Sequence, residues 1–152
     1  MTSPATSSPI VLTADGRDWL AARRERIVER LTRVDEDLAA DRTAELLDER
    51  ATLTDQLDEL TDVLRRAVAP GEISDDPTVV ELGDEVDIVF PGDDRETFLV
   101  VHPVEAGMDE QRTSAESPLA KAVLGHRVGD QVTVTTPGGV YHATIAGRRR
   151  LA

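Results

Sequence analysis

The chain of 152 residues contains no cysteine, which excludes disulfide bonds, thiolate catalysis and cysteine metal sites. Aromatic residues make up only 3% of it. No apolar run approaches the roughly 18 to 20 residues that a transmembrane helix needs. The start, MTSPATSSPI, lacks the basic segment and apolar core of a secretory signal. We therefore expect a disordered tail over residues 1–10 and a cytoplasmic protein without a membrane partner.

Positive charge is also scarce. Lys121 is the single lysine among 17 basic residues, and 30 acidic residues give a formal net charge of -13. Binding to duplex DNA depends on a basic surface that neutralises phosphates. Sequence-specific DNA binding is therefore not expected, although local basic patches are compatible with this charge.

Proline is absent from residues 13–67 and Gly16 is the only glycine there, so this segment is expected to be helical. Apolar residues recur three and four positions apart in two registers. Extending the first register past Leu38 puts acidic residues on the seam, so two helices that meet near residues 39–43 fit better than one. The registers are Leu20, Ile27, Leu31, Val34 and Leu38, then Leu46, Leu53, Leu57, Leu60 and Leu64.

Folded back about residue 42, the two registers pair layer by layer. This predicts an antiparallel coiled-coil hairpin over residues 11–69, with arms of about 24 residues and roughly 36 Å. Asp41 is expected to cap the second arm, and Arg24 and Arg50 to fix the register. Because the turn has no glycine or proline, a bent single helix that dimerises is kept as an alternative structure. The corresponding alternative function is a dimeric coiled-coil interaction module.

A small domain is predicted over residues 78–152, after a polar linker over residues 70–77. Apolar patterns predict strands at 85–90 and 97–102, joined by a turn, and two later strands around the turn at 137–139.

A short helix is expected between these strand pairs. Ser117 is a suitable N-cap, Pro118 suits the first helical position and Gly125 suits the end. The predicted fold class is α+β, with an N-terminal antiparallel α-helical coiled-coil hairpin followed by a small β-sheet domain with one short helix.

Several C-terminal motifs occur in a specific order: Ser117-Pro118-Leu119-Ala120 with Leu124-Gly125, then Gly129-Asp130, then Thr136-Pro137-Gly138-Gly139 before an alternating last strand. With them, the chain resembles the bacterial Gre transcript-cleavage factors over nearly all of residues 11–151. Rnk-type polymerase-binding regulators have a similar C-terminal pattern.

This resemblance implies an FKBP-like C-terminal domain that docks on bacterial RNA polymerase, and a hairpin that enters the polymerase secondary channel. The docking residues that it implies are Ser117, Pro118, Leu119, Leu124, Gly125, Pro137, Gly138 and Gly139.

The resemblance also implies metal-assisted chemistry at the hairpin tip. In cleavage-competent members an Asp-Leu-x-Glu-Asn stretch helps to hold a Mg²⁺ that activates water, while polymerase supplies the other carboxylates. Mg²⁺ is a hard cation that prefers oxygen ligands. Here Asp37 matches the Asp, but Ala40 stands at the Glu position and Asp41 at the Asn position. The arms are also about one heptad shorter than in the cleavage factors.

The chain is therefore expected to have no cofactor of its own. Asp37 and Asp41 are the candidate catalytic residues, and Asp35, Glu36, Asp37 and Asp41 are candidate ligands of a Mg²⁺ shared with polymerase. A solvated turn with a helix cap explains this acidic cluster about as well.

The missing Glu favours modulation or inhibition of transcription over efficient cleavage. The protein is expected to be a monomer and an accessory factor that acts on RNA polymerase, not an enzyme itself. Genuine transcript cleavage in backtracked complexes stays the alternative.

A basic stripe lies on one face of the first arm, formed by Arg23, Arg26, Arg30 and Arg33. One interpretation is contact with the nascent RNA 3′ end or acidic channel walls. The interpretation that we favour is pairing with acidic residues on the same arm and on the other one, such as Glu29, Asp48, Asp55 and Asp62.

An FKBP-like domain also suggests a function of another class, that of a prolyl isomerase or chaperone. Such activity uses an aromatic-lined apolar pocket, but Phe90, Phe98 and Tyr141 are the only aromatic residues of this domain.

Overall fold

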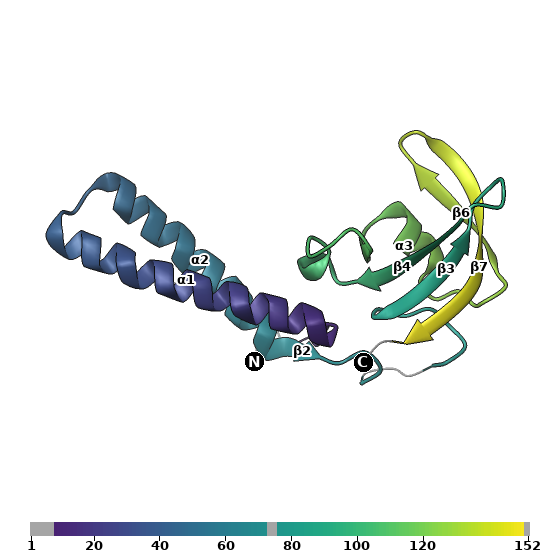
Figure 1. The fold of residues 1–152 in the computed structure, drawn as a ribbon, viewed down its shortest axis with the longest axis horizontal. Coiled ribbons are helices and arrows are strands. Elements are labelled where there is room, and N and C mark those ends of the chain that lie inside the picture. Colours follow the sequence, from purple (N-terminus) through teal and green to yellow (C-terminus); the bar gives the residue numbers. More distant parts are fainter. Residues whose placement is uncertain (1–7, 73–75, 151–152) are drawn as a thin grey trace, which may run out of the picture. The chain divides into compact units, whose positions relative to one another are not determined.

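The computed structural model describes residues 8–72 and 76–150 (Figure 1). They form two compact units: Arg17–Ala67 belong to the first, whereas Pro9–Gly16 and the residues from Val68 onward belong to the second. The boundary expected at residue 11 therefore differs from the observed one, because Pro9–Gly16 belongs to the second unit. Residues 1–7 of the expected tail lie outside the described residues.

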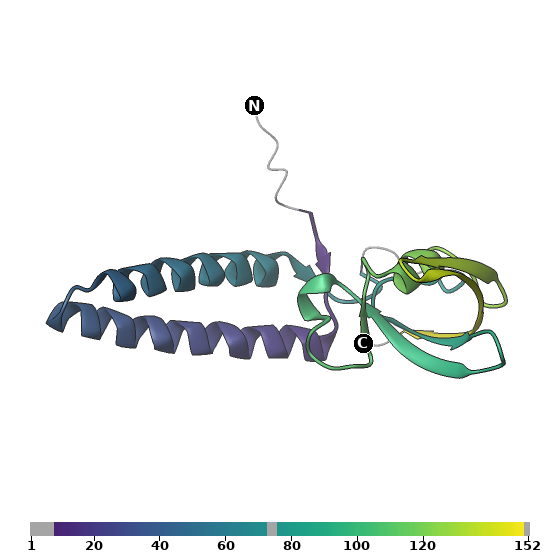
Figure 2. The same ribbon diagram turned by 90° about the horizontal axis from the view of Figure 1, so that it is seen from above.

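The first unit is an antiparallel helical hairpin (Figure 2). Its helices are α1 (Ala14–Ala40), whose first turn lies in the second unit, and α2 (Ala44–Arg66). The seam is the row of apolar side chains through which the two helices pack. On α1 a buried side chain recurs every one or two turns, so that these side chains share one helix face. The buried residues of the seam are Leu20, Ile27, Val34, Leu38 and Leu60.

Polar contacts across the hairpin confirm the predicted pairing to within one residue. Arg24 Nε donates to Thr61 Oγ1 at 2.9 Å, and Arg50 Nε donates to Asp35 Oδ1 at 2.8 Å. Both arginines hold the register, as expected for polar residues at seam positions. The hairpin, rather than a bent single helix, is thus the fold of this segment.

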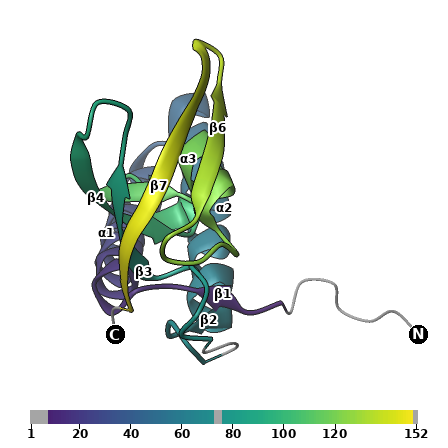
Figure 3. The same ribbon diagram turned by 90° about the vertical axis from the view of Figure 1, so that its right-hand side faces the viewer.

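The second unit is built on a curved five-stranded sheet with the strand order β5-β4-β3-β7-β6. Neighbouring strands are antiparallel except for β4 and β5, which are parallel. The long strand β7 lies between β3 and β6 (Figure 3). The bounds are β3 (Asp84–Val89), β4 (Arg95–Val101), β5 (Arg112–Ser114), β6 (Gln131–Thr136) and β7 (Gly139–Arg150).

Three short elements complete the fold. Helix α3 (Pro118–Val123) packs Ala120 and Val123 into the core against the sheet. A 3-10 turn, η2 (Pro103–Glu105), follows β4. Strands β1 (Ile10–Val11) and β2 (Ala67–Val68) form a separate two-stranded sheet, which the sequence did not predict.

The core of the second unit follows from strand periodicity. Val86 and Ile88 on β3 alternate with less buried residues, and they meet Val134 and Ile145 from the neighbouring elements. All four strands expected from the sequence, and the helix between them, are present, so the predicted α+β class is confirmed. Within the described ranges, no helix is both long enough and apolar enough to cross a membrane.

Candidate functional site

The tip of the hairpin is a three-residue turn between α1 and α2. The Asp41 N–H donates to the Asp37 carbonyl at 2.9 Å, so Asp41 continues the last turn of α1. The Thr43 N–H then donates to the Asp41 carbonyl at 3.2 Å. The expected cap at Asp41 is therefore wrong: Thr43 has extended backbone, and its Oγ1 accepts the Leu46 N–H at 3.2 Å.

The four acidic candidates at the tip differ in their surroundings. All are exposed. Arg50 donates a hydrogen bond to the Asp35 carboxylate, whereas no side-chain hydrogen bond or ion pair is found within the described ranges for Glu36, Asp37 and Asp41. Asp37 and Asp41 are one helical turn apart and so share a face. In the part of the chain that the structure describes, no three acidic or histidine side chains lie close enough together to hold a metal ion.

A hollow of about 450 Å³ lies beside the turn. Arg42 and Leu47, which sequence reasoning did not single out, contribute to it, and Leu47 is 40% exposed. Its other lining residues are Asp35, Leu38, Ala39 and Arg50.

The basic stripe on α1 has one paired member. Arg30 donates to both carboxylate oxygens of Glu49, at 2.7 and 2.9 Å. This hydrogen-bonded pair raises the pKa of Arg30 and lowers the pKa of Glu49. The favoured pairing with acidic residues thus occurs for Arg30, with a partner that the sequence did not indicate. No ion pair is found for Arg23, Arg26 and Arg33 within residues 8–72 and 76–150, and all three are exposed.

Three predicted docking residues shape the ends of α3. Ser117 Oγ accepts the Ala120 N–H at 3.1 Å, and Pro118 is the first residue of the helix. Gly125 has a φ of +82°, which an L side chain rarely adopts, so a glycine fits after the C-cap residue Leu124. The start and end of this helix were therefore predicted correctly from local chemistry.

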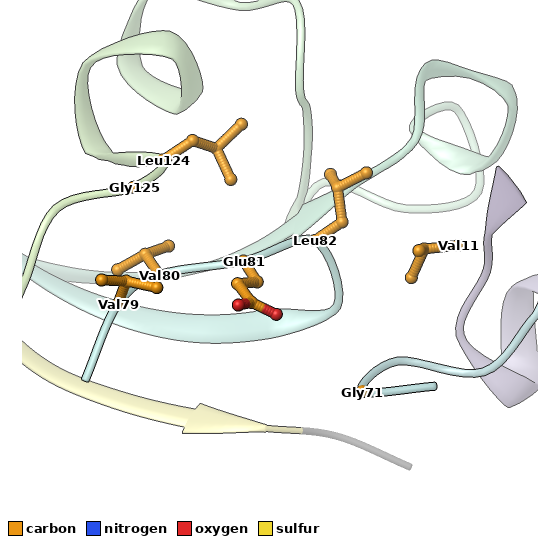
Figure 4. A pocket seen from close by; sticks show the side chains of 8 residues that line it. All are labelled: Val11, Gly71, Val79, Val80, Glu81, Leu82, Leu124 and Gly125. Carbon is orange, nitrogen blue, oxygen red and sulfur yellow. The ribbon is translucent and has the colours of Figure 1, made fainter. Parts of the chain in front are cut away.

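Leu124 and Gly125 also line an apolar hollow of about 410 Å³ in the second unit (Figure 4). The Gly125 N–H donates to the Val80 carbonyl at 2.9 Å, which joins the end of α3 to the chain before β3. The other lining residues are Val11, Gly71, Val79, Val80, Glu81 and Leu82.

The remaining docking candidates lie elsewhere in the unit. Leu119 packs against the core, and Pro137, Gly138 and Gly139 form the exposed turn between β6 and β7. This turn is the free end of the β6–β7 hairpin (Figure 3). The structure therefore brings together the residues around α3 but leaves the β-turn as a separate surface.

The three aromatic side chains of the second unit form one cluster. Phe90 contacts Phe98 edge to face, with ring centroids 6.1 Å apart, and Tyr141 at 5.8 Å. All three pack against the core, and none lines the apolar hollow of this unit. The aromatic-lined pocket of the prolyl isomerase alternative is therefore absent from that hollow.

Comparisons with known proteins agree with this architecture. Residues 75–147 match the family model described as "Transcription elongation factor, GreA/GreB, C-term". Transcription elongation factor GreA of Geobacillus kaustophilus is 42% identical over 93 residues, which span 60% of this chain and 59% of that protein.

Longer alignments extend the similarity to both units. GreA of Oceanobacillus iheyensis is 34% identical over 84% of this chain and 89% of its own length. GreA of Bacillus cereus is 36% identical over 93% and 97%.

One solved structure is GreA factor homolog 1 (Gfh1) of Thermus thermophilus, 31% identical over 93% of this chain and 99% of that one, with a TM-score of 0.42. The sequence relatives settle the family: the chain belongs to the GreA/GreB family of transcription elongation factors.

Proposed function

We propose that this protein binds bacterial RNA polymerase in the cytoplasm through its second unit and inserts the helical hairpin into the secondary channel. There it modulates or inhibits RNA synthesis rather than stimulating efficient transcript cleavage. The names of its GreA relatives support a role in transcription elongation. The observation that carries the proposal is the tip, where the exposed carboxylates of Asp37 and Asp41 share a face and Ala40 offers no third one.

The tip fits a metal ion that another protein also holds. Mg²⁺ is commonly bound by one or two protein carboxylates together with waters and phosphate oxygens. Asp37 and Asp41 supply two carboxylates, Asp35 is engaged by Arg50, and Ala40 contributes none. When bound, the ion would neutralise negative charge on the RNA, and Asp37 and Asp41 would help to hold it. Because this chain offers no further ligands there, we expect the tip to shift the position of the ion rather than to organise a water molecule for attack on the RNA.

The free arginines of the basic stripe support insertion beside nucleic acid or acidic protein walls. Arg23, Arg26 and Arg33 are exposed, and no acidic partner neutralises them within the described residues. A partner of negative charge would therefore meet three available guanidinium groups on one helix face.

The test is a transcript-cleavage assay on stalled elongation complexes with cognate polymerase and Mg²⁺, with single-round RNA synthesis scored in parallel. We expect reduced synthesis and little shortened RNA with the wild-type protein. The double variant Asp37→Ala, Asp41→Ala should lose most of the effect if the carboxylates act, and keep it if the hairpin only blocks the channel. Asp55→Ala, at an exposed position farther along α2, is the matched control.

Each outcome changes the proposal in a defined way. Shortened RNA that depends on Asp37 and Asp41 would make the protein a genuine cleavage factor despite Ala40. The reciprocal variant Ala40→Glu restores the missing carboxylate and should raise cleavage if this position limits it. Absence of both binding and any effect on synthesis would remove the polymerase role altogether.

A further inference from the structure

A fully buried carboxylate in the second unit holds the first turn of α1. Glu105, in η2, has no exposed surface. Its Oε2 accepts the Thr13 N–H at 3.0 Å, and its Oε1 accepts the Thr13 hydroxyl at 2.7 Å. Thr13 is itself 3% exposed, and its Oγ1 also accepts the Gly16 N–H at 3.0 Å, so it caps the helix.

An arginine completes the cluster. Arg112 Nε lies 3.2 Å from Glu105 Oε1, and its side chain is 7% exposed. The same guanidinium also bonds Asp109 and approaches Thr13 Oγ1 at 3.4 Å. The buried carboxylate therefore accepts three hydrogen bonds, one of them from a charged partner, as a buried charge requires.

Gly16 leaves the space that this carboxylate occupies. A Cβ added at Gly16 would lie 2.4 Å from Glu105 Oε1, a separation that real Cβ atoms do not show. Any larger residue at position 16 would push the carboxylate away from Thr13. Thr13 and Gly16 at the start of α1 thus pack against Glu105 and Arg112, which lie about 90 positions later in the sequence. We call these four residues the latch.

The route of the chain gives the latch a consequence. The chain has two passages between the hairpin and the second unit, after Gly16 and after Ala67. The second passage leads directly into the sheet domain, whereas the segment Pro9–Gly16 is held in the second unit by non-covalent contacts. These include the latch and the Leu12 N–H, which donates to the Val68 carbonyl at 3.0 Å. When the latch opens, the first turn of α1 loses its side-chain anchor, whereas the backbone pairing of this segment with Val68 remains.

We propose that the latch restrains the α1 end of the hairpin, while the chain itself connects the α2 end, and that Thr13 and Glu105 are positioning residues for the insertion of the tip. This inference rests on the proposed polymerase function for its effect on transcription. The restraint itself is a property of the isolated protein. The two parts of the inference are therefore testable separately.

The variants remove the latch in three chemically different ways. Glu105→Gln keeps the shape but removes the charge that faces Arg112, Thr13→Val removes the hydroxyl, and Gly16→Ala inserts a wedge. The matched control is Asp84→Asn, because Asp84 is also fully buried in the second unit and also faces arginines, Arg148 and Arg150. It makes no contact with the latch in the described structure.

Amide exchange and a distance measurement report on the restraint in the full chain. Losing the partner of a buried group should accelerate exchange of the Thr13 and Gly16 amides by about 5- to 150-fold in Glu105→Gln. Because the chain has no cysteine, spin labels at Ala51→Cys and Glu96→Cys, both at exposed positions, report the distance distribution between the units. We expect a broader distribution in the three latch variants and an unchanged one in Asp84→Asn.

The effect on transcription is measured with the same proteins. Latch variants should bind polymerase as the wild type does in a competition assay but inhibit RNA synthesis several-fold less. Two results would overturn the latch. One is an equally broad distance distribution in Asp84→Asn. The other is unchanged exchange of the amides at positions 13 and 16 in folded Thr13→Val. A wild-type protein without effect on polymerase would instead overturn the proposed function, while the exchange and distance results still decide on the latch.

Discussion

The two units of this protein place their charged groups in different environments. In the hairpin, the pairs Arg30–Glu49 and Arg50–Asp35 lie at the surface, with more than a third of each side chain exposed. In the second unit, Asp84 is fully buried and faces arginines whose side chains are 10% and 16% exposed. Water screens the exposed pairs of the hairpin, so each contributes little to stability. Breaking a buried pair of the second unit instead leaves an uncompensated charge that is buried away from water.

This difference matches what each unit has to do. Surface charges on the hairpin are available to a partner, and the apolar seam holds the arms together. Buried charges in the second unit join segments that are far apart in sequence: Asp84 joins the end of β7 to the turn before β3, and Glu105 joins η2 to the start of α1. The hairpin should therefore tolerate changes of charge that the second unit does not.

The largest effect is expected for Asp84→Ala. This change leaves Arg148 and Arg150 without their buried partner, and it should lower the free energy of unfolding by about 3 to 5 kcal/mol. Urea unfolding followed by the circular dichroism of Tyr141, the only tyrosine, measures the second unit. Asp87→Ala, a change of a less buried acid on the same strand, is the matched control and should cost clearly less. Equal losses would show that burial does not separate the two carboxylates.

Removal of apolar volume should dominate in the hairpin. Ile27 is 6% exposed on the seam, and Ile27→Ala should cost about 2 to 5 kcal/mol because it leaves a cavity. The fluorescence of Trp19, the only tryptophan, reports on α1 during unfolding.

The control is Leu47→Ala, which removes a similar volume at a position that is 40% exposed. It should shift the transition far less. A larger loss at Leu47 than at Ile27 would contradict the seam as the main source of hairpin stability.

Local patterns in the sequence predicted those parts of the fold that local chemistry determines. The spacing of leucines gave the hairpin register, and Ser117, Pro118 and Gly125 gave the ends of α3. Strands β1, β2 and β5 contain only two or three residues, too few for a period to be recognised. Asp41 and Thr43 are both good caps, and backbone conformation alone decided between them.

Long-range contacts were not predictable in this way. Thr13 and Glu105 are 92 positions apart, and neither lies in a motif that points to the other. Glu49, one residue beyond the expected partner Asp48, was missed because a one-residue difference changes the helix face by about 100°. The functional roles of the tip acids, the free arginines and the docking residues stay predictions, since they concern a partner.

A smaller effect is expected for the cross-arm pair at the hairpin tip. Asp35 and Arg50 are each about half exposed, so Asp35→Asn should lower the free energy of unfolding by about 0.2 to 1 kcal/mol. Denaturant unfolding followed through Trp19 measures this loss. Asp55→Asn is the control, because Asp55 is exposed and no ion pair is found for it among the described residues. A loss as large as that of Ile27→Ala would mean that charge, rather than the seam, holds the tip together.

The smallest effect is expected at Glu49, and it depends on pH. Hydrogen bonding to Arg30 lowers the pKa of Glu49 below its ordinary value of 4.5. Its contribution to stability is therefore fully present above pH 4.5 and is lost as pH falls through the lowered pKa. The difference in melting temperature between the wild type and Glu49→Gln should be small at neutral pH, vanish toward acid and shrink in high salt, because the pair is exposed. A difference that instead grows toward acid would mean that Arg30 does not stabilise the charged form of Glu49.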